Sequence, residues 1–236
     1  PRPPPRYPCP RSTPCGPRRY PYIYYLCEDY EVKDREPEFT VSVSEDEILK
    51  EQNGEEQFSS GYCESLCIYR KICLKMIEYD AFLMHSAAIA MDGEAYVFSA
   101  PSGVGKTTHI RLWKQRFGDR VQVINGDKPI YRFIGDKLYV CGTPWRGKEY
   151  MGSNMMSPVK AVCFLEQNPE NHIRLLNTEE VSRHIFSQVL LPKDIEIFDR
   201  FWLLLERMVT TNNFYELKCN RQPEAAELAY QTMRSE

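Results

Sequence analysis

The sequence predicts a mixed α/β fold in which a partly antiparallel sheet carries a phosphate-binding loop and is flanked by helices. Strand-like apolar segments alternate with helical ones along most of the chain, as α/β folds require. Residues 100–107 read Ala-Pro-Ser-Gly-Val-Gly-Lys-Thr, a glycine-rich loop between an expected strand and an expected helix. Asp92-Gly93 joins the strand that enters this loop to the strand before it, and an Asp-Gly pair is the strongest short hairpin signal. In ordinary P-loop proteins a helical crossover leads to the neighbouring strand instead.

The N-terminal part is expected to be a small β/α portion. Aromatic and β-branched residues in 20–26 and 38–43 predict two strands. Ser44 and Glu47 have the spacing of a capping box, which predicts a short helix ending near Gly54.

The middle of the chain is expected to hold the loop and its neighbours. Ser59 or Ser60 caps a helix to about Tyr79, and 81–91 and 94–99 form the hairpin. The remaining expected elements of this part are, in order, helix 106–117 stopped by Gly118, strand 121–125, a second hairpin of 130–134 and 137–141 turning at Gly135-Asp136, and a long loop at 142–157.

The C-terminal part is expected to complete the sheet. Its elements are, in order, strands 159–166 and 172–176, helices 179–190 (capped by Thr178) and 194–211, strand 214–219, and a helix starting at Pro223.

Composition limits the function classes. The chain of 236 residues suits one large domain, which we place at 20–236, with the nucleotide-binding core at 59–236. Residues 1–19 form a Pro- and Arg-rich arm, either disordered or foreign to the native chain. A net charge of -3 gives no reason to expect nucleic acid, and no apolar run is long enough to cross a membrane. Nine cysteines, an odd number, fit free thiols in a reducing cytoplasm.

The loop at 100–107 predicts a nucleotide polyphosphate as ligand. Its backbone N–H groups converge on phosphate, and the helix that follows favours an anion at its N-terminus. Lys106 can reach the terminal phosphates, and the Thr107 hydroxyl can ligate Mg²⁺. The expected nucleotide-binding residues are Ser102, Gly103, Val104, Gly105, Lys106, Thr107 and Thr108.

Asp127 follows an apolar strand soon after the loop. An acid at such a strand end can hold Mg²⁺ or accept a proton from an attacking hydroxyl. The alternative is an Asx turn before Pro129.

Two further sets of residues are candidates. Arg146 and Lys148 can neutralise a transferring phosphoryl group, and Glu149 can share a metal, unless the loop is merely solvated. His85 lies in the strand paired with the loop strand, where it either faces the phosphates or is a core histidine.

The motifs HSAAIAMDGEAYVFSAPSGVGKTTH, INGDKP and GTPWRGKE resemble the short bacterial proteins related to HPr serine kinase/phosphorylase. That family shares its nucleotide-binding core with ATP-dependent phosphoenolpyruvate carboxykinase. The resemblance covers about residues 60 to 235. It implies a mixed sheet, binding of ATP and Mg²⁺, and transfer of the γ-phosphoryl group to a hydroxyl.

The resemblance also implies roles for single residues. Lys106 would hold the β- and γ-phosphates and Thr107 the metal, while Asp127 would match the acid beside the transferred phosphate. His85 would match a histidine at the start of the hairpin, and Lys148 lies in the loop that closes over the site. The family has paired acids where this chain has Gly126-Asp127.

Three functions remain open at this point. The first is an ATP- and Mg²⁺-dependent kinase acting on a Ser or Thr hydroxyl of a protein, a peptide or a small molecule. A precursor of a ribosomally made peptide is one such acceptor, because short relatives often resemble peptide-tailoring enzymes. The second is a nucleotide-binding regulatory module without transfer, which the single acid favours. A decarboxylating kinase ranks last because the chain is short, and a homo-oligomer stays open.

Overall fold

The computed structural model describes residues 20–32, 34, 36–52 and 58–235, so the predicted arm at 1–19 lies outside the described residues. The chain divides into two compact units, Pro1–Met76 and Ile77–Glu236. This division groups residues 59–76 with the N-terminal part, whereas the sequence placed them in the nucleotide-binding core. Within the described residues, every helix is too short or too polar to span a lipid bilayer.

The first unit contains three helices: α1 (Tyr22–Cys27), α2 (Glu45–Gln52) and α3 (Ser60–Met76). The predicted capping box starts α2, because the Glu47 N–H donates to Ser44 Oγ and the Ser44 N–H donates to the Glu47 carboxylate at 2.9 Å. Ser59 Oγ likewise accepts from the Tyr62 N–H at the start of α3.

The two strands predicted at 20–26 and 38–43 are wrong, and the described residues of 20–58 contain no strand. Aromatic residues favour a strand only where a partner strand can pair with it. Here the segment after Pro21 forms a helix that packs on α3, with the Tyr22 and Tyr62 ring centroids 6.2 Å apart.

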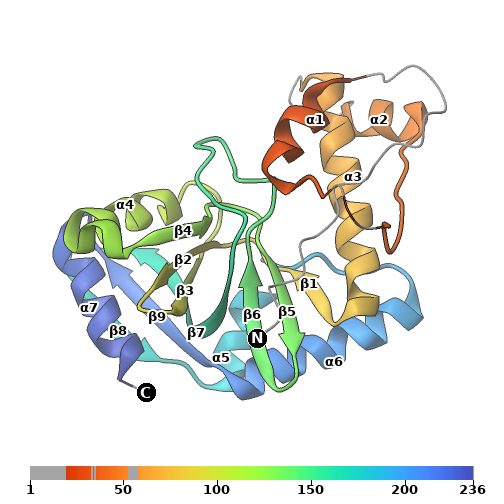
Figure 1. Ribbon diagram of the computed structural model, residues 1–236. Coiled ribbons are helices and arrows are strands. Elements are labelled where there is room, and N and C mark those ends of the chain that lie inside the picture. Colours follow the sequence, from red (N-terminus) through yellow and green to blue (C-terminus); the bar gives the residue numbers. More distant parts are fainter. Residues whose placement is uncertain (1–19, 33, 35, 53–57, 236) are drawn as a thin grey trace. The chain divides into compact units, whose positions relative to one another are not determined.

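The second unit is a sheet with helices on both faces (Figure 1). Its strands are β1 (Ala81–Leu83), β2 (Ala87–Met91), β3 (Glu94–Ser99), β4 (Gln122–Asn125), β5 (Ile130–Ile134), β6 (Lys137–Cys141), β7 (Met156–Gln167), β8 (His172–Leu175) and β9 (Asn213–Cys219). Its helices are α4 (Lys106–Phe117), α5 (Thr178–Ile185), α6 (Ile195–Thr211) and α7 (Pro223–Arg234). The α/β class and the mixed sheet predicted from the sequence are confirmed.

Strand order brings four carboxyl ends to one edge. The order is β1-β5-β6-β7-β3-β2-β4, and β9 pairs with β7 and β8. β3 and β9 run parallel to β7, while β2 is antiparallel to both β3 and β4. The strands β4, β3, β7 and β9 therefore all point the same way, and the segments that follow them meet at the same edge of the sheet.

The predicted hairpin between β2 and β3 is present. Asp92 and Gly93 both have positive φ, 55° and 86°, which is the backbone of a type I′ turn. The strand predicted at 81–91 is wrong as one element, because it breaks into β1, paired with β5, and β2, paired with β3 and β4. His85 and Ser86 lie in the break. The helix predicted at 179–190 ends early, at Ile185, and its N-cap is Asn177 rather than Thr178.

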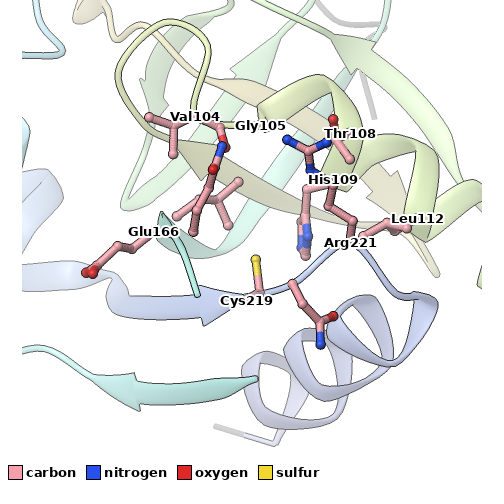
Figure 2. A pocket seen from close by; sticks show the side chains of 11 residues that line it. Val104, Gly105, Thr108, His109, Leu112, Glu166, Cys219 and Arg221 are labelled. Atoms are coloured by element: carbon pink, nitrogen blue, oxygen red, sulfur yellow. The ribbon is translucent and has the colours of Figure 1, made fainter. Parts of the chain in front are cut away.

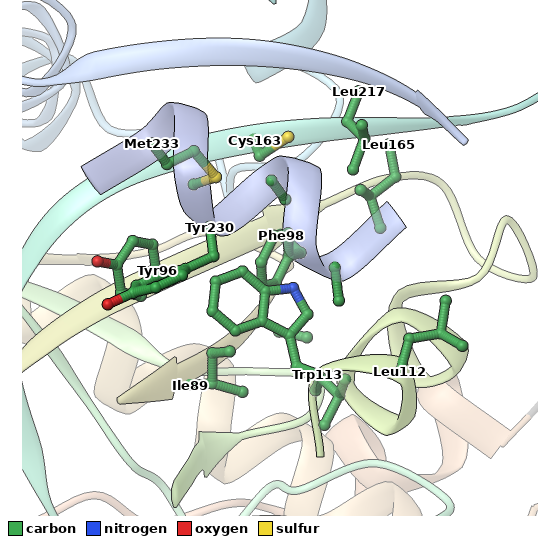
Figure 3. Packing of buried hydrophobic residues seen from close by; sticks show 14 of the residues in the cluster. Ile89, Tyr96, Phe98, Leu112, Trp113, Cys163, Leu165, Leu217, Tyr230 and Met233 are labelled. Carbon is green, nitrogen blue, oxygen red and sulfur yellow. The ribbon is translucent and has the colours of Figure 1, made fainter. Parts of the chain in front are cut away.

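The two faces of β7 bury different sets of side chains. Ala161, Cys163 and Leu165 face the cluster under α4 and α7, whereas Phe164 stacks on His184 of α5. Trp113 of α4 is fully buried at the centre of the first cluster, against the rings of Tyr96 and Tyr230 (Figure 3). This packing holds α4 on the sheet directly after the loop at 100–105.

Candidate functional site

The loop between β3 and α4 turns at two glycines that have positive φ. Gly103 and Gly105 have φ of 82° and 128°, and a Cβ at either position would meet nothing within 4 Å. Glycine is therefore needed for the backbone angle and not for space. Gly105 is the N-cap residue of α4 and has no side chain, so within the described residues the first N–H groups of the helix have no side-chain cap and can bind an anion.

Lys106 is buried although it carries a charge. Its side chain is 8% exposed, and its Nζ donates to the Ala100 carbonyl at 2.8 Å. Burial lowers the pKa of Lys106, and the nearby Asp127 carboxylate acts in the opposite direction. The amine is thus a desolvated cation on the floor of the loop, which an anionic phosphate would stabilise.

Asp127 is held by two cationic or donor groups. His85 Nε2 lies 3.1 Å from Asp127 Oδ1, and Lys128 Nζ pairs with Oδ2. Burial acts to raise the pKa of Asp127, but the hydrogen bond with His85 and the charge of Lys128 hold it well below its usual range. The carboxylate is therefore a firmly ionised, weakly basic group.

Buried Asn125 sets the turn that presents Asp127. Its Oδ1 accepts the N–H groups of Asp127 and Lys128, each at 2.8 Å. Its Nδ2 donates to the carbonyl and hydroxyl of Thr143 at 3.1 and 3.0 Å. An Asx turn is thus present, but Asn125 makes it and leaves the Asp127 carboxylate to face His85 and Lys128.

The break between β1 and β2 positions His85. The His85 N–H donates to the Gln188 carbonyl at 2.6 Å, and the Ser86 N–H donates to the Asp127 carbonyl at 3.2 Å. Ser99, the last residue of β3, donates from its hydroxyl to the His85 carbonyl at 2.8 Å. These bonds connect His85 to both Asp127 and the entrance of the loop.

The long loop after β6 packs against the turn at Asp127. A Cβ on Gly147 would come within 2.8 Å of the Asp127 Cβ, and the Gly126 N–H donates to the Met151 carbonyl at 2.8 Å. Arg146 Nη1 lies 3.4 Å from the Gly152 carbonyl of the same loop. Lys148 is exposed.

The predicted nucleotide-binding residues follow the course of the loop. Ser102 and Gly103 are exposed, Lys106 is buried, and the half-buried members are Val104, Gly105, Thr107 and Thr108. The structure thus brings together Lys106, Asp127 and His85, and it adds Asn125 and Lys128, which sequence reasoning missed. The motif Asn-Gly-Asp-Lys-Pro contained both, but neither has a role until the chain is folded.

Of the three predicted magnesium ligands, Thr107 is the one whose surroundings fit the ion best. Thr107 lies in the first turn of α4, where its hydroxyl could hold the ion together with phosphate oxygens. Both oxygens of Asp127 already have partners, and Glu149 Oε2 pairs with Arg111 Nη2 at 2.7 Å on the exposed side of α4. Within the described residues, no three His, Cys, Asp or Glu side chains form a metal-binding group.

Comparison with known proteins finds likeness in structure but none in sequence. No family model and no characterised protein matches the sequence. The HPr(Ser) kinase/phosphatase from Coxiella burnetii is similar over 64% of this chain and 95% of its own, with 10% identity and a TM-score of 0.38. At this identity and TM-score the likeness assigns neither a family nor an activity.

Proposed function

We propose that the protein transfers the terminal phosphoryl group of a nucleoside triphosphate, ATP in the first instance, to a Ser or Thr hydroxyl. The observation that carries this proposal is the Asp127–His85 pair at the same sheet edge as the phosphate loop. Many proteins bind nucleotides through such a loop, but a half-buried carboxylate near its lysine is what favours transfer to a hydroxyl.

Each group then has a role in the transfer. The loop N–H groups and Lys106 bind the phosphates, and Thr107 would hold Mg²⁺, which would neutralise phosphate charge. Asp127 accepts a hydrogen bond from the acceptor hydroxyl, and His85 fixes the carboxylate. As the new O–P bond forms and the bond to the leaving diphosphate breaks, the hydroxyl proton passes to Asp127. That proton becomes acidic late in a loose transition state, so a weakly basic carboxylate suffices.

The acceptor class follows only from the chemistry and from the sequence resemblance. We propose a protein or peptide seryl or threonyl group, including the precursor of a ribosomally made peptide. No nucleic acid or membrane partner is part of the proposal, and the cytoplasm is the proposed compartment.

The test is transfer of label from γ-labelled ATP, with Mg²⁺, into a pool of Ser- and Thr-containing peptides. We expect acid-stable phosphopeptide with the native protein. With Asp127→Asn we expect transfer to fall on the order of 100-fold, while nucleotide affinity changes much less. Asp136→Asn serves as the matched control, because it makes the same change in an exposed ion pair of the β5–β6 turn, outside the site.

A second candidate function has one observation in its favour. Lys128 and His85 occupy both oxygens of Asp127, as in a structural ion pair. A regulatory module would bind ATP without transferring it. Equal ATP affinity of the native protein and Asp127→Asn, with no transfer by either, would decide for the module and against the kinase.

A further inference from the structure

A pocket lies beside the phosphate loop (Figure 2). It is bounded by the start of α4, by the end of β7 and by the segment that follows β9. Its apolar walls are Val104, Leu112 and Leu165, and Cys219 and Arg221 close the β9 side. Gln167 fastens this wall to the loop, because its Nε2 donates to the Val104 carbonyl at 2.8 Å.

A buried hydrogen-bond donor lines this pocket. His109 of α4 is 2% exposed, and its Nε2 accepts from Trp113 Nε1 at 3.0 Å. Burial lowers the pKa of His109 to about 3, so the ring is neutral and its one proton must be on Nδ1. That Nδ1–H finds no hydrogen-bond partner among the described residues. An unpaired buried donor is costly, on the order of 1–3 kcal/mol.

The sheet topology says what could supply the missing acceptor. The carboxyl ends of β4, β3, β7 and β9 share one edge, in the spatial order β4, β2, β3, β7, β9. Asp127 follows β4, the phosphate loop follows β3, and the pocket lies at the ends of β7 and β9. A nucleotide whose terminal phosphate points toward Asp127 must extend its nucleoside the opposite way, toward this pocket.

We propose that the pocket receives the purine base of the nucleotide and that His109 Nδ1–H donates to an acceptor atom on the edge of that base. This inference rests on the proposed nucleotide-binding function. Apolar walls with a few placed polar groups are the usual composition of such sites. In Figure 2 the His109 ring and the Cys219 sulfur project into the same space, with Arg221 close by.

The size of the pocket limits how the purine ring can lie in it. Its volume is about 30 Å³, little more than a water molecule requires. The ring therefore lies across the mouth, against Val104 and the exposed Arg221 side chain, and only its acceptor edge reaches inward. Purines present ring nitrogens, and guanine also a carbonyl oxygen, along such an edge.

The test compares ATP, GTP and CTP with inorganic triphosphate as ligands of the full chain. We expect a purine nucleotide to bind at least about 10-fold more tightly than triphosphate, as one or two added contacts would give. Cys219→Phe, which fills the pocket, should remove this advantage and leave triphosphate affinity unchanged. Arg221→Ala provides a second variant with no core change, and Lys114→Ala, on the exposed side of α4, is its matched control.

Nuclear magnetic resonance can detect the His109 Nδ1–H donor directly. The His109 Nδ1–H resonance should shift when ATP is added to the native protein and should not shift with triphosphate. Each of three results would overturn the inference. They are equal affinities for ATP and triphosphate, the same preference for ATP in Cys219→Phe as in the native protein, and a His109 Nδ1–H resonance that does not shift when ATP is added. The last result would leave a bound water as the acceptor of the His109 Nδ1–H.

The same data separate this inference from the proposed function. Base-dependent binding without phosphoryl transfer would keep the pocket and reject the kinase. If neither ATP nor triphosphate binds, both proposals fail together.

Discussion

Lys106 and Asp127 are ionised groups whose charges the fold keeps partly out of water. Burial lowers the pKa of Lys106, while the partners of Asp127 hold the pKa of that carboxyl down. A buried charge without full compensation is a poor contributor to stability. Its presence beside the loop at 100–107 fits the proposed role in ligand binding.

We predict that Lys106→Met weakens nucleotide binding on the order of 10- to 100-fold, because a charge-assisted bond to phosphate is lost. The free energy of unfolding should change by less than about 1 kcal/mol, since removing a desolvated charge offsets the loss of the bond to Ala100. Calorimetric titration with ATP and urea unfolding measure the two effects. A large loss of stability would mean that Lys106 is a structural residue.

The lowered pKa of Asp127 predicts how the stability of the protein depends on pH. The pKa of Asp127 in the folded state lies below the unfolded value of about 3.9. Its contribution to the free energy of unfolding is therefore complete above that pH. As pH falls further, the unfolded state takes up the proton first and the contribution is lost. The stability difference between the native protein and Asp127→Asn should therefore shrink below about pH 4. Urea unfolding from about pH 7 to about pH 2.5 tests this, and a constant difference would contradict it.

At the scale of elements, the loop after β6 controls how close a backbone can come to Asp127. Gly147 has φ of 76°, and a Cβ added to it would lie only 2.8 Å from the Asp127 Cβ. Any side chain here must displace either the loop or the turn that Asn125 holds. The loop is therefore a part of the site through its backbone, whatever Arg146 and Lys148 contribute.

Gly147→Ala should lower phosphoryl transfer on the order of 100-fold, because a displacement of about 1 Å at the reacting group has such effects. Gly135→Ala is the matched control. Gly135 also has positive φ, 57°, but lies in the β5–β6 turn, where a Cβ would meet nothing within 4 Å. Both variants should lose about 1 kcal/mol of stability from backbone strain, and Gly147→Ala should lose more because its Cβ displaces the loop or the turn. Transfer rates and urea unfolding distinguish them, and equal transfer rates would exclude a role for the close contact.

At the scale of the whole molecule, every predicted site residue lies in the second unit, Ile77–Glu236. The first unit, as far as it is described, is helical and supplies none of them. A compact unit with its own sheet and its own buried cluster meets the requirements for independent folding.

We accordingly expect a fragment of residues 77–236 to unfold cooperatively and to bind ATP with the affinity of the full chain. Denaturant unfolding and calorimetry provide the measurements, with the full chain as the control. An insoluble fragment would show that the second unit needs the first unit to fold. A soluble fragment that binds ATP more than about 10-fold more weakly would show that the first unit contributes to the site.

Local signals predicted much of this fold from the sequence. Features that depend on residues a few positions apart could be predicted directly from the sequence. They are the Asp92-Gly93 hairpin, the loop at 100–107, the Ser44 cap and the helix end at Gly118. The strands predicted at 20–26 and 38–43 failed because a strand needs a partner, and propensity cannot say whether one exists.

The site divides in the same way. The sequence predicted the loop at 100–107 and the acid at Asp127, because the loop and the acid each follow a predicted strand within a few positions. The chain could not show that His85 leaves the strand to meet Asp127, 42 residues away, or that Asn125 and Lys128 bind the same turn. Nor could it show that His109 turns an unpaired donor toward a pocket at the ends of β7 and β9. Those relations arise from the order of the strands and from burial, which long-range packing decides and no local pattern encodes.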